Sequence, residues 1–196
     1  MLRNRRFVLA GSTACIFVPL QALAFTKEDA KTLVTALVND INTVIASGKS
    51  EQAMFRDFER IFARYSDTSY IAAYAMGVDG RRASTAQKRA FSNAFKGYIS
   101  RKYGRRFREF IGGRLEVKTV NTVKNWFEVS TIAFLKGHAP FNITFQVSNR
   151  SGKPLFFNMS IEGINLLLTE RTEIGALLDR KGGDIDAMIA TLTQAG

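Results

Sequence analysis

The feature that most constrains the fold of this chain is a change in hydrophobic period around Gly163. In the segment before this glycine, apolar and polar residues alternate, which is typical of a half-buried strand with Phe157, Met159 and Ile161 on one face. After the glycine, apolar residues recur every three or four positions, which predicts a helix that ends at a pair of glycines. The chain is therefore expected to end as strand, turn, helix and a last helix that Asp184 can cap.

The first 24 residues have the three parts of a secretory signal peptide. Three arginines precede an apolar run that extends from Phe7 to about Leu20, and small residues that end at Ala24 form a cleavage site. A membrane anchor is the alternative, but it needs roughly 20 clean apolar residues, and polar residues interrupt this run. We therefore expect residues 1–24 to be a signal peptide and residues 25–196 to be a single domain.

The export route and the cysteine content follow from the same segment. Arg5-Arg6 also resembles a twin-arginine signal, so the choice between Sec export and twin-arginine export stays open. Cys15, the only cysteine, lies in the part that we expect to be removed, so the mature protein should have no disulfide, thiolate nucleophile or cysteine metal site. No later segment is long and apolar enough to span a bilayer, and we expect a soluble mature protein.

The first half of the mature chain predicts four helices. Thr26 and Ser50 can cap the first two, a short third covers residues 69–76, and a capping box at Ser84 begins a long fourth helix that reaches about Gly104. Apolar residues recur at helical spacing along the first, second and fourth of these helices.

From Gly113 the period changes to two, which predicts three further strands before the one at residues 157–161. Their alternating residues are Leu115 and Val117, then Phe127, Val129 and Thr131, then Phe141, Ile143, Phe145 and Val147. Turns at residues 121–125 and 149–152 join neighbouring strands as hairpins. We therefore expect an α+β fold, in which N-terminal and C-terminal helices pack on a four-stranded twisted antiparallel sheet.

The chain offers few residues suited to catalysis. His138 is the only histidine and lies in a predicted loop, and a catalytic or metal-binding histidine would need partners. Glu116 and Glu128 could face each other across a hairpin as a carboxylate pair, although their polar neighbours favour a solvated sheet face. The sequence contains no Gly-rich phosphate loop after a strand and no Gly-x-Ser-x-Gly motif. We expect no enzyme activity and no metal.

Positive charge is concentrated in one part of the chain. The net charge is +11, and residues 81–124 hold thirteen Lys or Arg against only Glu109 and Glu116. In a cytosolic protein this pattern would indicate nucleic acid, but export favours lipid headgroups or acidic protein surfaces as partners. A solvated basic helix without a partner is the alternative. The expected docking residues for a partner or headgroup are Arg101, Lys102, Arg105 and Arg106.

Three parts of the chain together resemble the MlaC family. They are residues 70–77, the stretch from residue 86 to residue 103 with its Gln87-Lys88-Arg89-Ala90-Phe91 motif, and the strand–Glu-Gly–helix ending. In this order and spacing they are similar to the central and C-terminal elements of the family, which comprises the periplasmic phospholipid-binding components of the Mla lipid-transport pathway. The resemblance covers roughly residues 55–194.

The resemblance implies a periplasmic, non-enzymatic phospholipid shuttle that needs no cofactor and binds no nucleic acid. Its implied partners are phospholipid, an inner-membrane ABC transporter complex with a lipid-binding ring subunit, and an outer-membrane lipoprotein–porin complex, and we expect a monomer. Sixteen Phe and five Tyr suit an apolar cavity for acyl chains, with an ordinary core as the alternative. The expected lipid-binding residues are Tyr74, Phe95, Ile99, Tyr103, Leu115, Val117, Phe127, Val129, Phe141, Ile143, Phe145, Val147, Phe157, Met159, Ile161 and Leu167.

Two other functions stay open. One is a carrier of another apolar lipid such as a hopanoid, because a related branch of the family is associated with hopanoid biosynthesis. The other is a small hydrolase or isomerase that acts on a lipid. The enzyme would need a general acid or base inside the apolar cavity, and no residue of the sequence stands out for that role.

Overall fold

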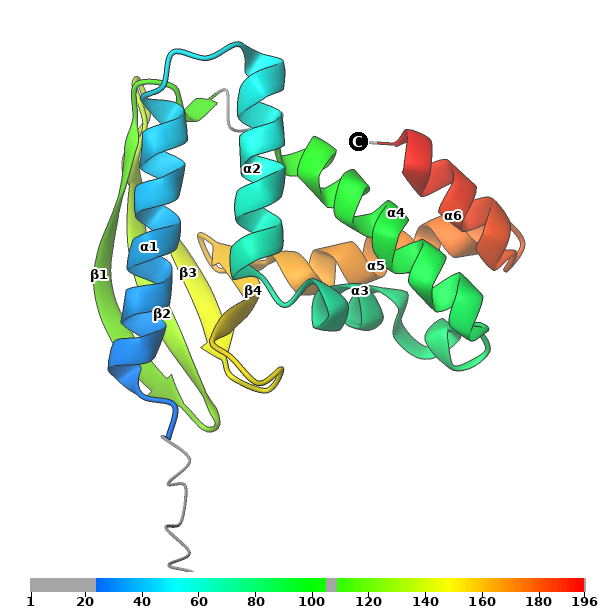
Figure 1. Ribbon diagram of the computed structural model, residues 1–196. Helices are drawn as coiled ribbons and strands as arrows, with labels where there is room; N and C mark the ends of the chain where they lie inside the picture. The colour runs from blue at the N-terminus through cyan, green and yellow to red at the C-terminus, as the bar shows by residue number, and fades with distance from the viewer. Residues whose placement is uncertain (1–23, 105–108, 196) are drawn as a thin grey trace, which may run out of the picture.

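The computed structural model describes residues 24–104 and 109–195, so all of the predicted signal peptide except Ala24 lies outside the described residues. Within them the fold combines helices with one antiparallel sheet (Figure 1). The elements are α1 (Lys27–Ile45), α2 (Glu51–Tyr65), α3 (Thr68–Met76), the short 3-10 helix η1 (Gly77–Arg81), α4 (Thr85–Gly104), β1 (Arg114–Val123), β2 (Trp126–Phe134), β3 (Phe141–Ser148), β4 (Leu155–Ile161), β5 (Ile164–Asn165), α5 (Leu166–Arg180) and α6 (Ile185–Gln194).

The predicted α+β class is confirmed, but the predicted number of strands is wrong. The sheet has the order β1-β2-β3-β4-β5, and every neighbouring pair is antiparallel. The additional strand β5 pairs Ile164 with Ile161. It follows a two-residue turn in which Glu162 (φ 48°) and Gly163 (φ 79°) both have positive φ, as a tight hairpin turn requires. The Glu-Gly pair therefore reverses the chain before the helix begins.

The sheet also contains two register shifts that simple alternation of apolar and polar residues does not predict. The first lies between Val117 and Thr119 in β1. Beyond this shift β1 stays paired with β2 as far as Val123, which lies opposite Trp126. The turn predicted at residues 121–125 is therefore only two residues long, 124 and 125. The second shift accompanies the pairing of Val147 with Phe156. Phe156, rather than the predicted Phe157, therefore takes the sheet position across from β3, and it joins the buried core.

Local capping explains where the helices begin. Thr26 forms the capping box of α1, and the Ser84 hydroxyl accepts a hydrogen bond from Gln87 N (3.1 Å) at the start of α4. The carboxylate of Asp184 accepts hydrogen bonds from the backbone of α6, as predicted. Ser50 precedes α2, but its side chain makes no capping hydrogen bond, so that detail of the prediction is wrong.

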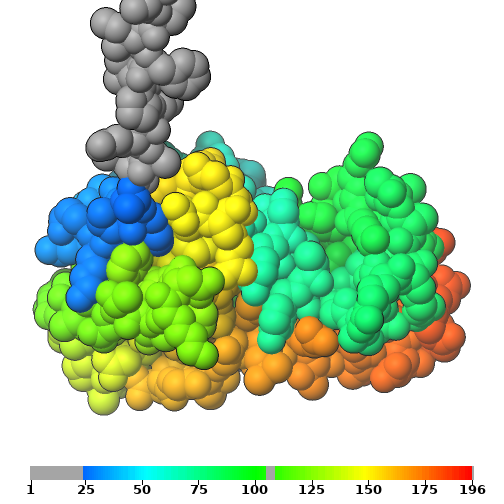
Figure 2. Space-filling model, turned by 90° about the horizontal axis from the view of Figure 1, so that it is seen from below, coloured from blue at the N-terminus to red at the C-terminus, as the bar shows by residue number. Residues whose placement is uncertain are grey.

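The helices form two groups around the sheet (Figure 1). Helix α1 lies along the sheet, with α2 beside it, and Asn42 joins α1 to the backbone of Leu115 in the edge strand β1. Helices α3 to α6 extend from the β4 side, where α3 packs on α5 and α4 packs on α6 (Figures 1 and 2). In residues 24–104 and 109–195, no helix combines the length and the apolar character that a membrane span requires.

Candidate functional site

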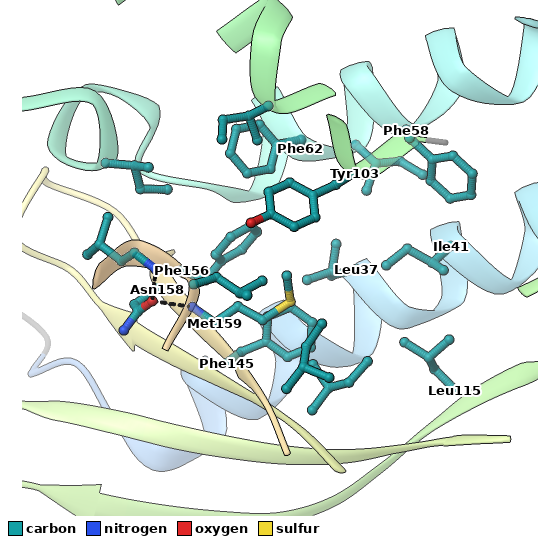
Figure 3. Close-up of a pocket in the computed structure, with 18 of the residues that line it drawn as sticks. Leu37, Ile41, Phe58, Phe62, Tyr103, Leu115, Phe145, Phe156, Asn158 and Met159 are labelled. Atoms are coloured by element: carbon teal, nitrogen blue, oxygen red, sulfur yellow. Dashed lines mark hydrogen bonds between the residues drawn. The ribbon is translucent and has the colours of Figure 1, made fainter. Parts of the chain in front are cut away.

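A cavity of about 490 Å³ lies between the inner face of the sheet and helices α1 to α5 (Figure 3). Its volume falls within the range of roughly 300–1,000 Å³ that is usual for small-molecule sites. The sheet contributes Leu115, Phe141, Ile143, Phe145, Phe156, Phe157, Asn158, Met159 and Ile161 to the lining. The helices contribute Leu37, Ile41, Phe58, Ile61, Phe62, Ile71, Ile99, Ser100, Tyr103, Gly104, Leu166, Leu167 and Glu170.

Aromatic rings form much of the wall between the sheet and α2. The rings of Phe145 and Phe156 meet edge to face at 5.6 Å, and those of Phe62 and Phe156 do so at 5.8 Å. Figure 3 shows Leu37 and Ile41 of α1 on another side of the same space, with Met159 directed into it from β4. A lining of this kind favours apolar ligand atoms over water.

Asn158 fixes the corner where β4 meets α5. The residue is buried, and its Oδ1 accepts hydrogen bonds from the backbone N of Met159 (2.8 Å) and of Leu167 (3.1 Å), which Figure 3 shows as dashed lines. Its Nδ2 donates to Gln146 Oε1 (3.0 Å). A buried amide can make four hydrogen bonds, and three are made here: one within β4, one that joins β4 to the start of α5, and one that joins β4 to β3.

A polar corner interrupts the apolar part of the described lining, between α4 and α5. Glu170 is only 3% exposed, and its Oε1 accepts hydrogen bonds from Lys102 Nζ (2.7 Å) and Tyr103 Oη (2.6 Å). Lys102 Nζ also donates to Glu173 Oε2 (2.5 Å), which accepts a further hydrogen bond from Tyr98 Oη (2.9 Å). This group of five side chains therefore connects the cavity wall with the protein surface.

The surroundings of the polar corner set the protonation states of Lys102 and the two tyrosines. Burial opposes the charge of Lys102, but hydrogen bonds to Glu170 and Glu173 outweigh burial and raise the pKa of the lysine above its ordinary value. Burial, followed by the hydrogen bond to Glu170, raises the pKa of Tyr103. Burial is also the main reason that the pKa of Tyr98 rises to about 12. At neutral pH Lys102 is therefore charged, and both tyrosines are protonated donors.

The structure brings ten of the sixteen expected lipid-binding residues together in the cavity wall. These ten are Ile99, Tyr103, Leu115, Phe141, Ile143, Phe145, Phe157, Met159, Ile161 and Leu167. The other six lie outside the lining: Tyr74, Phe95, Val117, Phe127, Val129 and Val147.

Those six pack against the rest of the protein. Val129 and Val147 are completely buried within the sheet–helix core. Phe95 stacks on Phe91 with 5.4 Å between ring centroids, and Phe127 meets Phe25 edge to face at 5.0 Å. Tyr74 is placed against Tyr70 and the guanidinium of Arg171, and Val117 is a partly buried member of the core.

Sequence reasoning missed the contributions of α1, α2 and Glu170 to the wall. Leu37, Ile41 and Phe58 belong to helical stripes that look like ordinary core, so nothing in their spacing marks them as lining residues. Glu170 had a usable signal, because it falls on the stripe of α5 that is otherwise buried and apolar. A carboxylate at such a position is rarely buried without a partner.

The expected docking residues divide into two pairs. Arg101 donates hydrogen bonds to the backbone oxygens of Leu192 (2.8 Å) and Ala195 (2.8 Å), at the C-terminal end of α6, and Lys102 belongs to the polar corner. Arg105 and Arg106 lie outside the described residues.

The other candidate residues for catalysis do not form a site. Glu116 and Glu128 lie opposite Ile132 and Asn121, so they do not face each other as a carboxylate pair. His138 is exposed in the turn before β3. Within residues 24–104 and 109–195, no three His, Cys, Asp or Glu side chains are grouped so that they could hold a metal ion.

Comparisons with known proteins agree with this architecture. The family model described as MlaC protein matches residues 31–194, which confirms the resemblance that the sequence motifs predicted. Among solved structures, one similar fold is that of a phospholipid-binding protein from Ralstonia solanacearum in complex with a phospholipid. The TM-score is 0.73 at 18% sequence identity, and the match covers 85% of this chain and 96% of that chain. At this level of identity, the structural match supports a shared fold.

Proposed function

The chain belongs to the MlaC family, and from this premise we propose that it is a carrier that buries phospholipid acyl chains in the apolar cavity. The observation that carries the proposal is the 490 Å³ space between the sheet and the helices, with a wall built largely of Phe, Ile, Leu and Met side chains. The phospholipid complex of the Ralstonia protein, which has the same fold, supports it.

The energetics of acyl chains explain why such a protein would be needed. Each methylene gains about 0.8 kcal/mol on leaving water, so two chains of about 16 carbons resist leaving a bilayer by roughly 25 kcal/mol. Spontaneous passage across an aqueous compartment is then negligible. A carrier must offer a dry cavity of comparable quality and release its lipid directly into another apolar site. It needs neither a cofactor nor enzyme activity of its own.

We place the carrier in the periplasm, where it moves lipid between an outer-membrane lipoprotein–porin complex and an inner-membrane ABC transporter complex with a lipid-binding ring subunit. The signal peptide predicted for residues 1–24 and the family assignment support this placement. We assign docking to these partners or to headgroups to the basic segment, residues 81–124, which holds thirteen Lys or Arg. Arg101 and Lys102 already make internal contacts, so the docking role is tested most cleanly at Arg105 and Arg106.

The test is to identify what the protein carries when it is purified from cells. Native mass spectrometry should show a mass increment, and organic extraction should recover phospholipid. Ligand-free protein in both experiments would contradict the proposal. A hopanoid as the single extracted species would favour the alternative lipid carrier.

One observation favours a second function, in which the protein modifies a lipid. Glu170 is a buried carboxylate in the cavity wall, which is the general acid or base that an enzyme of this shape would need. The carrier remains the better-supported function. The hydroxyl oxygen of Ser100, the serine in the lining, has no hydrogen-bond partner among the described residues and so forms no nucleophile–base pair there. Product analysis after incubation with phospholipid separates the two functions.

A further inference from the structure

Arginine and tyrosine side chains form a continuous row across helix α3. The guanidinium of Arg150 lies over the ring of Tyr70 (4.2 Å from Cζ to the ring centroid), and that of Arg171 lies over the ring of Tyr74 (5.2 Å). The centroids of the two tyrosine rings are 6.2 Å apart. These four side chains, the Arg–Tyr row, come from the β3–β4 turn, α3 and α5, and Figure 2 shows these segments next to one another in yellow, teal and orange.

Contacts on their faces hold both guanidinium groups in place. Arg150 also lies over the ring of Phe157 (4.4 Å), and its Nε donates a hydrogen bond to Ser148 Oγ (3.1 Å). Arg171 packs against Gly77, where an added Cβ atom would lie only 3.3 Å from the guanidinium carbon. Arg150 is exposed and Arg171 is partly exposed. A guanidinium that is fixed in this way can still bind a carboxylate through its edge with two parallel hydrogen bonds.

The positive charge of the row is not balanced by neighbouring carboxylates. Within residues 24–104 and 109–195, neither arginine of the row forms an ion pair. Helix α3 itself contains no charged residue. Asp67, which caps it, is only 4% exposed, and its two oxygens accept hydrogen bonds from the backbone of α3 and from the Ser151 hydroxyl. Asp79, which follows α3, pairs with Arg82 (3.0 Å). The row therefore attracts an anion from outside the chain.

The composition of the row favours a protein as the source of that anion. The hydroxyls of Tyr70 and Tyr74 have no hydrogen-bond partner in the described part of the chain, and neither oxygen is buried. Tyrosine and arginine are enriched at protein–protein interfaces and among the residues that contribute most to their binding energy. Anionic membranes are instead typically recognised by clusters of roughly four to eight Lys or Arg, whereas the row holds only two arginines.

We infer that the Arg–Tyr row is a docking surface for an acidic segment of another protein. Carboxylates of that segment bind the edges of Arg150 and Arg171, and its apolar side chains pack on Tyr70 and Tyr74. The surface lies outside the basic segment, residues 81–124, and does not depend on what the cavity holds. It also gives a role to Tyr74, which is not part of the cavity lining.

The test measures peptide binding by fluorescence anisotropy. The probe is a short labelled peptide rich in glutamate and leucine, and a matched peptide has glutamine in place of every glutamate. The unaltered protein should bind the glutamate peptide more tightly by about tenfold or more. Arg150→Gln and Arg171→Gln should each weaken its binding about tenfold, which corresponds to one charge-assisted hydrogen bond at the low end of its usual strength. Phe157 is left unchanged, because it also lines the cavity.

Two further variants separate the geometry of the row from the net charge of the protein. Arg150→Lys keeps the charge but loses the planar fork, so it should weaken binding nearly as much as Arg150→Gln. Arg56→Gln is the matched control, because Arg56 is an exposed arginine on α2 with neither a ring contact nor an ion pair among the described residues. It should bind the peptide as the unaltered protein does.

The outcomes separate this inference from the proposed function. Equal binding of the two peptides, full binding by Arg150→Lys, or a loss in Arg56→Gln as large as in Arg150→Gln would overturn it. Binding to phosphatidylglycerol vesicles that requires both arginines, without binding of the glutamate peptide, would also overturn it in favour of a membrane. Melting temperatures show that each variant is folded, and Arg171→Gln decides the question if Arg150→Gln does not fold. Lipid bound by the unaltered protein is measured separately, so the carrier proposal stands or falls on its own.

Discussion

A pair of tryptophan substitutions on β3 can distinguish a cavity for ligand from a packed core. Ile143 and Val147 are four residues apart on the inner face of the strand, and both are buried. Ile143 lines the cavity, whereas Val147 is completely buried between its neighbours Phe127 and Phe156 and does not line it. The two positions therefore share strand, face and hydrophobic pattern and differ in what lies in front of them.

The expected magnitudes follow from that difference. Val147→Trp forces extra atoms into a closed core, which typically costs 1–3 kcal/mol and sometimes more, or a fall in melting temperature of about 2–12 °C for a domain of this size. Ile143→Trp adds about six heavy atoms that can extend into the cavity. The indole then occupies the space of about six methylenes of the acyl chain. Loss of their burial would weaken lipid binding by roughly 5 kcal/mol, which is between three and four orders of magnitude in affinity.

The assay measures thermal unfolding of the lipid-free proteins and lipid retention by native mass spectrometry. We expect Ile143→Trp to keep most of its stability and lose its lipid, and Val147→Trp to lose stability but retain lipid in the fraction that folds. If Ile143→Trp were destabilised as much as Val147→Trp and still bound lipid, the inner face would be ordinary core at both positions. The ligand site would then lie elsewhere.

Three further predictions test the scaffold, the polar corner and the docking segment. Asn42→Ala removes two hydrogen bonds to the backbone of Leu115 at the edge of the sheet, which should cost about 1–3 kcal/mol in denaturant unfolding. Because burial raises the pKa of Tyr98 from 10.0 to about 12, its protonated form stabilises the fold fully below pH 10, and this stability is lost as pH rises toward 12. Unfolding measured across that window should show a shallower alkaline decline in Tyr98→Phe. Replacing Arg105 and Arg106 with Gln should leave bound lipid unchanged but slow transfer to anionic vesicles, with a flatter salt dependence, and unchanged transfer at every salt concentration would contradict the docking role.

Local signals were sufficient to predict most of the fold. The capping residues Thr26, Ser84 and Asp184 each mark a helix start that the structure contains, because a cap acts over three residues and needs no tertiary context. The strict alternation through β3 likewise predicted a strand with one buried face.

The register of the sheet could not be predicted in the same way. The shift opposite Val147 puts Phe156 across from it, although simple alternation places Phe157 on the same face as Met159. A bulge adds one residue to one strand only, and the pairing partner decides whether it is present. The short strand β5 had a visible signal in Glu162-Gly163, but the glycine was interpreted as the end of the strand.

The distinction between cavity wall and core depends on packing that no single segment contains. Ile143 and Val147 have the same pattern in the sequence, and only the way the helices pack against the sheet leaves space in front of one of them. Six expected lining residues lie in the packed part of the molecule for this reason. Hydrophobic period identifies a buried face, but it does not report what that face is buried against.

Glu170 shows how a sequence can nevertheless point to a polar site within an apolar cavity. The buried positions of α5 are Leu167, Glu170, Ile174 and Leu178, so the carboxylate takes the place of an apolar residue on the helical stripe. A charge at such a position is stable only with partners, and here Lys102 and Tyr103 on α4 supply them to one oxygen. The second oxygen lacks a donor in the described structure, although a packed core could have avoided that cost with a leucine. A charged residue within an apolar stripe therefore predicts a partner of opposite charge on the helix that packs against it, whereas the aromatic residues around it would be stable in a core of any kind.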